Sequence, residues 1–136
     1  MNDKIFRIID ANVNRLREAL RVCEDIARFI LSDKKITQRL KSLRHVAILN
    51  VSKLGGNGKI LTESRNSKKD VGKRTIKNEK KREDIADIFK ANIKRAEEAV
   101  RVLEEFSKLL KPSLSNRFKN MRFELYVLEK NIIKKL

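Results

Sequence analysis

Apolar residues recur at steps of three and four positions along most of the chain, which is the period of a helix with one face turned toward a core. A first run extends from Asp3 to Leu31, and a second one starts after the capping pair Ser32-Asp33. A third run begins near residue 85 and stops at Pro112, which lies just inside the start of a fourth run. The pattern therefore predicts an all-α fold with four helices.

The segment 55–82 has no regular apolar period. It is polar, rich in Lys, Asn and Ser, and it holds all four glycines of the chain. Glycine and short polar side chains favour turns and loops over regular elements. We predict a long loop between the second and third helices.

The first and third helical runs align without a gap when one is shifted by eighty positions, and eight identities fall within the fourteen positions of 11–24 and 91–104. The second and fourth runs are related more weakly, through arginines and a lysine at matching spacing. The repeating unit is thus a helical hairpin, at about 3–54 and again at 83–136. Two hairpins bury their apolar faces best against each other, so we expect one domain over 1–136, a four-helix bundle of two duplicated helical hairpins with an approximate two-fold axis.

The chain carries 34 lysines and arginines against 18 acidic residues, a formal charge of +16. Such a charge attracts polyanions, so nucleic acid is the first partner to consider. Aromatic residues make up only 5% of the chain, however, and leave few rings on which bases would stack. A phosphate-bearing small molecule is therefore favoured over nucleic acid.

Charged residues interrupt every apolar run, so no segment has the pattern of a membrane span. The amino terminus enters an amphipathic pattern directly and lacks the apolar core of a signal peptide. We therefore expect a cytoplasmic protein with no membrane partner. The single cysteine, Cys23, lies among apolar neighbours, and we expect it to pack in the core.

A polar motif lies within the apolar stripe of the first helix. A helical wheel at about 100° per residue puts Asn12 near the middle of the apolar arc, Arg15 on it and Glu18 at its edge. The third helix repeats the arrangement with Asn92, Arg95 and Glu98. The remaining charged residues of the two motifs fall nearer the polar side; they are Arg21, Glu24, Arg101 and Glu104.

Buried polar side chains need partners or a wet cavity, because an unpaired buried charge costs several kcal/mol. In one interpretation Arg15 pairs with Glu18 or Glu98, Arg95 makes the reciprocal contacts, and the network is purely structural. In the other, the hairpins enclose a polar pocket where the arginines grip phosphate oxygens and a glutamate holds magnesium. The sequence leaves both open.

These motifs together resemble the small monofunctional hydroxymethylpyrimidine-phosphate kinases of thiamin biosynthesis, which occur alone or fused to thiamin-phosphate synthase. The resemblance covers nearly the whole chain. Its carriers are Asp10-Ala11-Asn12, Asn14-Arg15, Glu18, Arg21, Glu24-Asp25, Arg28-Phe29, Leu43-Arg44-His45, Asp70-Val71-Gly72, Ala91-Asn92, Lys94-Arg95, Glu98-Ala99, Arg101 and Glu104-Glu105. It implies phosphoryl transfer from ATP to the pyrimidine monophosphate with Mg²⁺, an activity that depends on positioning and charge neutralisation.

The resemblance also suggests roles for single residues. It implies phosphate contacts for Arg15, Arg44 and Arg95, pyrimidine contacts for Asn12 and Asn92, and magnesium binding or arginine orientation for Glu18 or Glu98. Arg65, Asp70 and Gly72 match a loop segment that would close over the phosphates, with Asp70 as a metal ligand or catalytic helper. His45 stands beside Arg44 and suits proton transfer or phosphate contact, although a lone histidine is more often structural.

One departure from the family pattern bears on activity. An acidic residue is common in the family where Asn66 stands, and Lys73-Arg74 make the following turn unusually basic. The alternative function is therefore a non-catalytic module that binds a thiamin intermediate or supports the synthase as a partner. A basic nucleic-acid-binding protein is the third hypothesis, and a homodimer is compatible with all three.

Overall fold

The computed structural model describes residues 2–55, 58–74 and 81–136. Its α-helices are α1 (Asn2–Asp25), α2 (Lys34–Ser52), α3 (Gly58–Ser64), α4 (Ile85–Leu110) and α5 (Ser115–Ile133). A π-helical turn, Ile26–Ile30, extends α1, and a 3₁₀ turn, Pro112–Leu114, leads into α5. No strand occurs within these described ranges, so the predicted all-α class is confirmed.

Three of the long helices, α2, α4 and α5, begin where the sequence offers a cap or a proline. The side chain of Asp33 accepts a hydrogen bond from the Ile36 amide at 2.9 Å and caps α2. Asp84 does the same for α4 through the Asp87 amide at 2.8 Å. Pro112 opens the turn before α5. Proline is tolerated there because the first N–H of a helix has no acceptor within the helix.

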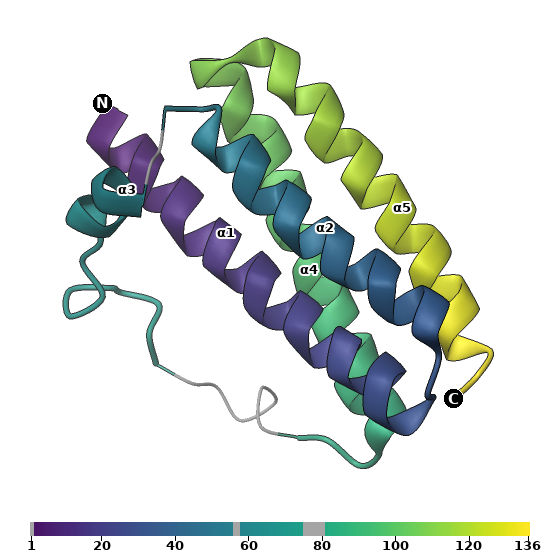
Figure 1. Cartoon of the computed structure of the whole chain (residues 1–136). Helices are drawn as coiled ribbons and strands as arrows, with labels where there is room; N and C mark the ends of the chain where they lie inside the picture. Colours follow the sequence, from purple (N-terminus) through teal and green to yellow (C-terminus); the bar gives the residue numbers. More distant parts are fainter. Residues whose placement is uncertain (1, 56–57, 75–80) are drawn as a thin grey trace.

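The four long helices lie side by side in one bundle, whose principal contact joins α1 to α4 (Figure 1). The two run in opposite directions and make the most extensive helix contact of the molecule, while α2 packs on α1 and α5 packs on α4. The helix α3 lies against α1. The first helices of the two hairpins therefore form the main contact between the hairpins, and each second helix packs mainly on its own first helix.

The duplication extends to the core. Fully buried positions recur at a shift of 80 between α1 and α4 and of 78 between α2 and α5. The matched core residues are Ile9, Val13, Leu16, Leu20 and Cys23 with Phe89, Ile93, Ala96, Val100 and Leu103, then Leu40, Leu43 and Ala47 with Phe118, Met121 and Leu125. Cys23 is completely buried, as the sequence predicts. Within the part of the chain described, no helix is both long enough and apolar enough to cross a membrane.

Two expectations about the first and third helices are wrong. Arg15, Glu18, Arg95 and Glu98 are exposed, whereas Glu24 and Glu104, which the wheel puts nearer the polar side, are only 3% and 5% exposed. The wheel averages over one helix and does not contain the second helix of each hairpin, which covers the flank carrying these two glutamates. The predicted loop 55–82 also contains a helix, α3, that the apolar pattern does not indicate.

Candidate functional site

A cavity of about 860 Å³ lies over the amino-terminal half of α1 and the segment that follows α3; we call it the α1–α3 pocket. Val102 of α4 closes one side of it. Its charged and amide-bearing lining residues are Lys4, Arg7, Asp10, Asn12, Asn14, Arg15, Arg65, Asn66 and Asp70. Four predicted site residues, Asn12, Arg15, Arg65 and Asp70, thus line one cavity.

An ion pair between a half-exposed arginine and a buried aspartate anchors the segment after α3 to α1. Arg65 donates from Nε to Asp10 Oδ2 and from Nη2 to Asp10 Oδ1, each at 2.8 Å. The Asp10 side chain is 7% exposed, and it also accepts a hydrogen bond from Asn14 Nδ2 at 3.2 Å. The hydrogen bonds and charge of Asp10 raise the pKa of Arg65 above its ordinary value. One wall of the pocket is therefore a bidentate guanidinium–carboxylate pair.

Asn12 holds the position of Arg15 beside this pair. Asn12 Nδ2 donates to the Ile8 carbonyl at 2.9 Å, and Asn12 Oδ1 accepts from Arg15 Nη1 at 3.4 Å. Neither Arg15 nor Arg95 forms an ion pair with any carboxylate of the described residues. The interpretation in which Arg15 pairs with Glu18 or Glu98 in a structural network is therefore wrong, and the other interpretation stays a prediction.

The turn after α3 is organised by its own polar side chains. Gly72 donates its amide to Asp70 Oδ1 at 2.8 Å, and the Lys69 amide donates to Asn66 Oδ1 at 3.3 Å. Arg7 Nη2 reaches from α1 to the Asn66 carbonyl at 3.4 Å. These bonds hold the Asp70 carboxylate at the rim of the α1–α3 pocket.

The second copy of the motif does not join this pocket. Asn92 repeats the backbone contact of Asn12, because its Nδ2 donates to the Ile88 carbonyl at 2.8 Å. Asn92, Arg95 and Glu98, together with Glu18 of the first copy, are absent from the lining of the α1–α3 pocket. The functional roles predicted for these residues stay predictions.

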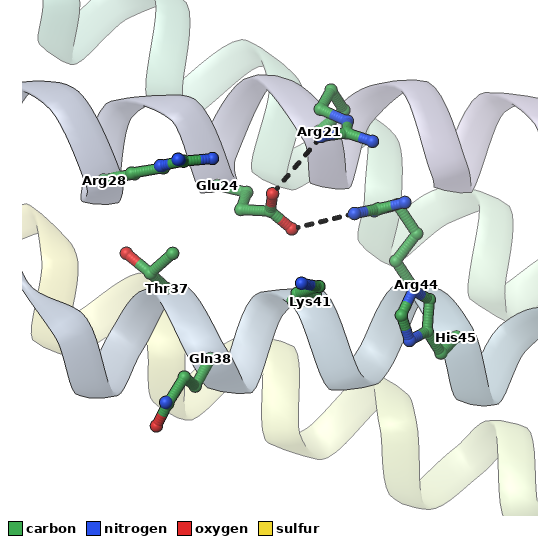
Figure 2. Close-up of a pocket in the computed structure, with 8 residues that line it drawn as sticks. All are labelled: Arg21, Glu24, Arg28, Thr37, Gln38, Lys41, Arg44 and His45. Atoms are coloured by element: carbon green, nitrogen blue, oxygen red, sulfur yellow. Dashed lines mark hydrogen bonds and ion pairs between the residues drawn. The ribbon is translucent and has the colours of Figure 1, made fainter.

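A second, strongly basic cavity of about 450 Å³ lies between α1 and α2; we call it the α1–α2 pocket (Figure 2). Glu24, which is almost fully buried, accepts from Arg44 Nη2 at 3.2 Å and lies 3.5 Å from Arg21 Nη1. The other lining residues are Arg28, Thr37, Gln38, Lys41 and His45. Arg44 and His45 therefore belong to this cavity and not to the one around Asn12.

The two cavities are well separated. Asn12 and Glu24 are about 18 Å apart along α1, at about 1.5 Å per residue. The sequence predictions give Arg44 and Arg15 the same role of contacting phosphate, and they give no site role to Arg28 or Lys41. The signal that could have found them is the match of Arg44 to Arg122 in the repeat, which marks a position facing the first helix of each hairpin.

The carboxylates available for a metal are few. Within the described ranges, no group of three or more His, Cys, Asp or Glu side chains could hold a metal ion. Mg²⁺ bound to phosphates, however, often uses only one or two protein carboxylates and keeps several waters. Asp10 and Asp70 line the same pocket and fit that requirement, with Asp10 already engaged by Arg65.

Comparison with known proteins covers almost the whole chain. The chain is 37% identical to a thiamine-phosphate synthase of Nostoc punctiforme over 95% of its own length and 35% of the relative's. It is 36% identical to the thiamine-phosphate synthase of Synechocystis, over 95% of its own length and 36% of the relative's. It is 37% identical to that of Rhodopirellula baltica, over 90% of its own length and 32% of the relative's. The chain thus spans about a third of the length of the curated relatives it matches.

No solved structure matches the chain significantly. The sequence model of the ThiD2 family matches residues 7–131, which include both hairpins and the segment that lines the α1–α3 pocket. This chain therefore belongs to the ThiD2 family.

Proposed function

We propose that the chain is a module of thiamin biosynthesis that binds a phosphorylated pyrimidine intermediate in the α1–α3 pocket. One observation carries the proposal. Lys4, Arg7 and Arg15 line this cavity, and no carboxylate of the described residues forms an ion pair with them. Three cations without a fixed counter-charge, set around a volume typical of small-molecule sites, suit a phosphate monoester.

The rest of the lining suits the heterocycle. Ile8, Ala11 and Val102 offer apolar surface, and the side-chain amides of Asn14 and Asn66 supply donors and acceptors for a ring edge. The pair of Asp10 and Arg65 would hold the wall rigid while a ligand enters. These features support a small, planar, phosphorylated ligand.

The module would act together with thiamin-phosphate synthase. The relatives named as this enzyme contain a stretch similar to the chain that occupies about a third of their length. A phosphorylated pyrimidine bound here would then be a compound that a neighbouring synthase consumes. This association supports the binding-module form of the proposal.

A more specific form is phosphoryl transfer from ATP to the pyrimidine monophosphate. In that step a phosphate oxygen of the monophosphate forms a bond to the terminal phosphorus of ATP, and the bond to the departing ADP breaks. Magnesium would supply charge neutralisation between Asp10 and Asp70 when bound with the nucleotide. Arg15, Arg7 and Lys4 would stabilise the equatorial oxygens, and Asp70 would orient the attacking phosphate. Glu18 and Glu98 keep their predicted supporting roles, although both are exposed.

Calorimetry with hydroxymethylpyrimidine monophosphate tests the binding module. Arg15→Gln should weaken binding about tenfold, whereas Arg17→Gln, which alters another exposed arginine of α1 outside the pocket, should leave it unchanged. Absence of binding to folded wild-type protein would overturn the proposal.

The kinase form needs a second measurement. Phosphorus NMR of the same mixture with ATP and Mg²⁺ should show the diphosphate product, and Asp70→Asn should slow its appearance. Tight binding without product would leave the binding module and reject the kinase.

A further inference from the structure

The duplication produces two copies of one ion-pair triad. In the first hairpin, Glu24 of α1 lies between Arg21 on the same helix and Arg44 on α2. In the second, Glu104 of α4 lies between Arg101 on the same helix and Arg122 on α5. The glutamates are both almost fully buried, yet the two copies differ in how completely their arginines are engaged.

The second copy is closed. Arg122 donates from Nε to Glu104 Oε2 at 2.9 Å, from Nη2 to Glu104 Oε1 at 3.4 Å and from Nη1 to the Tyr126 hydroxyl at 3.2 Å. Its guanidinium carbon also lies 5.2 Å from the centre of the Phe123 ring. All three nitrogens of Arg122 therefore have a partner inside the protein.

The first copy is open. Arg44 donates only from Nη2 to Glu24, while its Nε is buried and has no hydrogen-bond partner among the described residues. The contact from Arg21 to Glu24 is also longer, at 3.5 Å against 3.1 Å for Arg101 and Glu104. His45 and Ile48 stand where the second hairpin has Phe123 and Tyr126, so this position offers Arg44 neither a phenol hydroxyl nor a phenyl ring.

The two copies also differ in charge, because the first has cations without a paired carboxylate. Four cations line the α1–α2 pocket around the single carboxylate of Glu24. Within the described ranges, neither Arg28 nor Lys41 forms an ion pair. In the second hairpin the counterpart of Arg28 is Lys108, which is neutralised by Glu105 at 2.9 Å.

We propose that the α1–α2 pocket is a second anion site that takes a diphosphate group. The cavity is recessed between two helices and about 450 Å³ in volume, so it suits a compact anion more than a polymer or a membrane surface. A diphosphate matches the excess of cations, and one of its oxygens would accept the unpartnered Nε–H of Arg44. A free diphosphate and the diphosphate of a nucleotide share this chemistry.

The inference does not rest on the proposed function. The separation of about 18 Å along α1 exceeds the reach of a single phosphoryl transfer, which needs reacting atoms within about 3.5 Å. The pocket would therefore bind its anion whether or not the α1–α3 pocket binds a pyrimidine.

Calorimetry with inorganic diphosphate at about 0.15 M salt tests the site, using one lysine in each hairpin. Lys41 and Lys119 are exposed and occupy equivalent positions, so Lys41→Gln and Lys119→Gln remove the same charge from matched places. Lys41→Gln should weaken binding about tenfold and Lys119→Gln less than about twofold. Equal losses would overturn the site and indicate diffuse charge attraction.

A second variant copies the closed hairpin onto the open one. His45→Phe combined with Ile48→Tyr should engage Arg44 and abolish diphosphate binding without lowering thermal stability. Arg15→Gln, which alters only the other pocket, should leave diphosphate binding unchanged. Unimpaired binding in the closed variant, or its loss in Arg15→Gln, would contradict the proposal.

Parallel titrations with ADP and with adenosine distinguish a nucleotide from a free diphosphate, because only a nucleotide site gains affinity from the base and ribose.

Discussion

Arg65 reaches across 55 positions of sequence to hold both carboxylate oxygens of Asp10, with each nitrogen to oxygen distance at 2.8 Å. This pair joins the segment after α3 to the central helix α1 and forms one wall of the α1–α3 pocket. Because of this pair, the polar segment after α3 lines the α1–α3 pocket.

Loss of this contact should loosen the segment without unfolding the bundle. Arg65→Gln leaves the buried Asp10 carboxylate without its counter-ion, and we expect the free energy of unfolding to fall by about 1–2 kcal/mol, because the arginine itself is half exposed. Amide hydrogen exchange should accelerate across α3 and the turn at Asp70 more than in α1. The matched control is Arg74→Gln, an exposed arginine of the same segment, which should change neither quantity. Unchanged exchange in α3 would show that the pair does not anchor it.

The two ion-pair triads should contribute unequally to stability. Burial raises the pKa of Glu104, but the hydrogen bonds and charges of Arg122 and Arg101 outweigh it and hold that pKa below its ordinary value. Arg122→Gln removes the stronger partner and should lower the free energy of unfolding by about 2 kcal/mol, against about 1 kcal/mol for Arg44→Gln. Urea denaturation of both variants measures the difference. A larger loss for Arg44→Gln would contradict the distinction between a closed and an open copy.

A buried pair of carboxylates between α4 and α5 should make stability depend on pH. Glu97 and Glu129 share the ammonium of Lys94, at 3.3 Å and 3.1 Å, and each has a second oxygen that is buried without a partner in the described structure. Burial, and then the neighbouring charge of Glu129, raises the pKa of Glu97 from 4.5 to about 7. The folded state therefore holds a proton that the unfolded chain has released, and this contribution to stability is lost as pH rises from about 4.5 to about 7.

Removing the titrating group isolates this effect from the general charge of the protein. Glu97→Gln should be more stable than wild type by about 1–2 kcal/mol at pH 8, and the advantage should shrink toward pH 5. Thermal or urea denaturation at several pH values follows it. Glu98→Gln, which alters the adjacent exposed carboxylate, should keep the pH dependence of the wild type. An advantage for Glu97→Gln that is the same at pH 5 and pH 8 would rule out the assigned proton.

The thiol of Cys23 should be inert in the folded protein. Burial, followed by the nearby charge of Glu97, raises the pKa of Cys23 to about 12, and the residue has no exposed surface. A thiol reagent at pH 8 should therefore label the protein only as fast as it unfolds. Labelling rates measured across a urea series should follow the unfolding transition, and rapid labelling in native buffer would contradict a closed core.

Local signals along the chain are enough to predict the four long helices, the duplication and most of the core. The apolar period, the capping residues and Pro112 are local signals. The shift of 80 positions between α1 and α4 predicts that a buried position in one helix corresponds to a buried position in the other. Buried positions match in this way at Leu16 and Ala96 and again at Leu20 and Val100. The helical period and the repeat together predict that these residues face the core.

The positions of the charged residues depend on contacts between helices that are far apart in the sequence. A helix of seven residues such as α3 is marginal in isolation, and it depends on burial of Leu61 and on the bond from Arg65 to Asp10. Glu24 and Glu104 are buried because α2 and α5 bring an arginine to each, and a wheel of one helix carries no information about that partner. The division of the predicted site residues between two cavities has the same cause: spacing along α1 is local, but the neighbouring helix that completes each cavity is not.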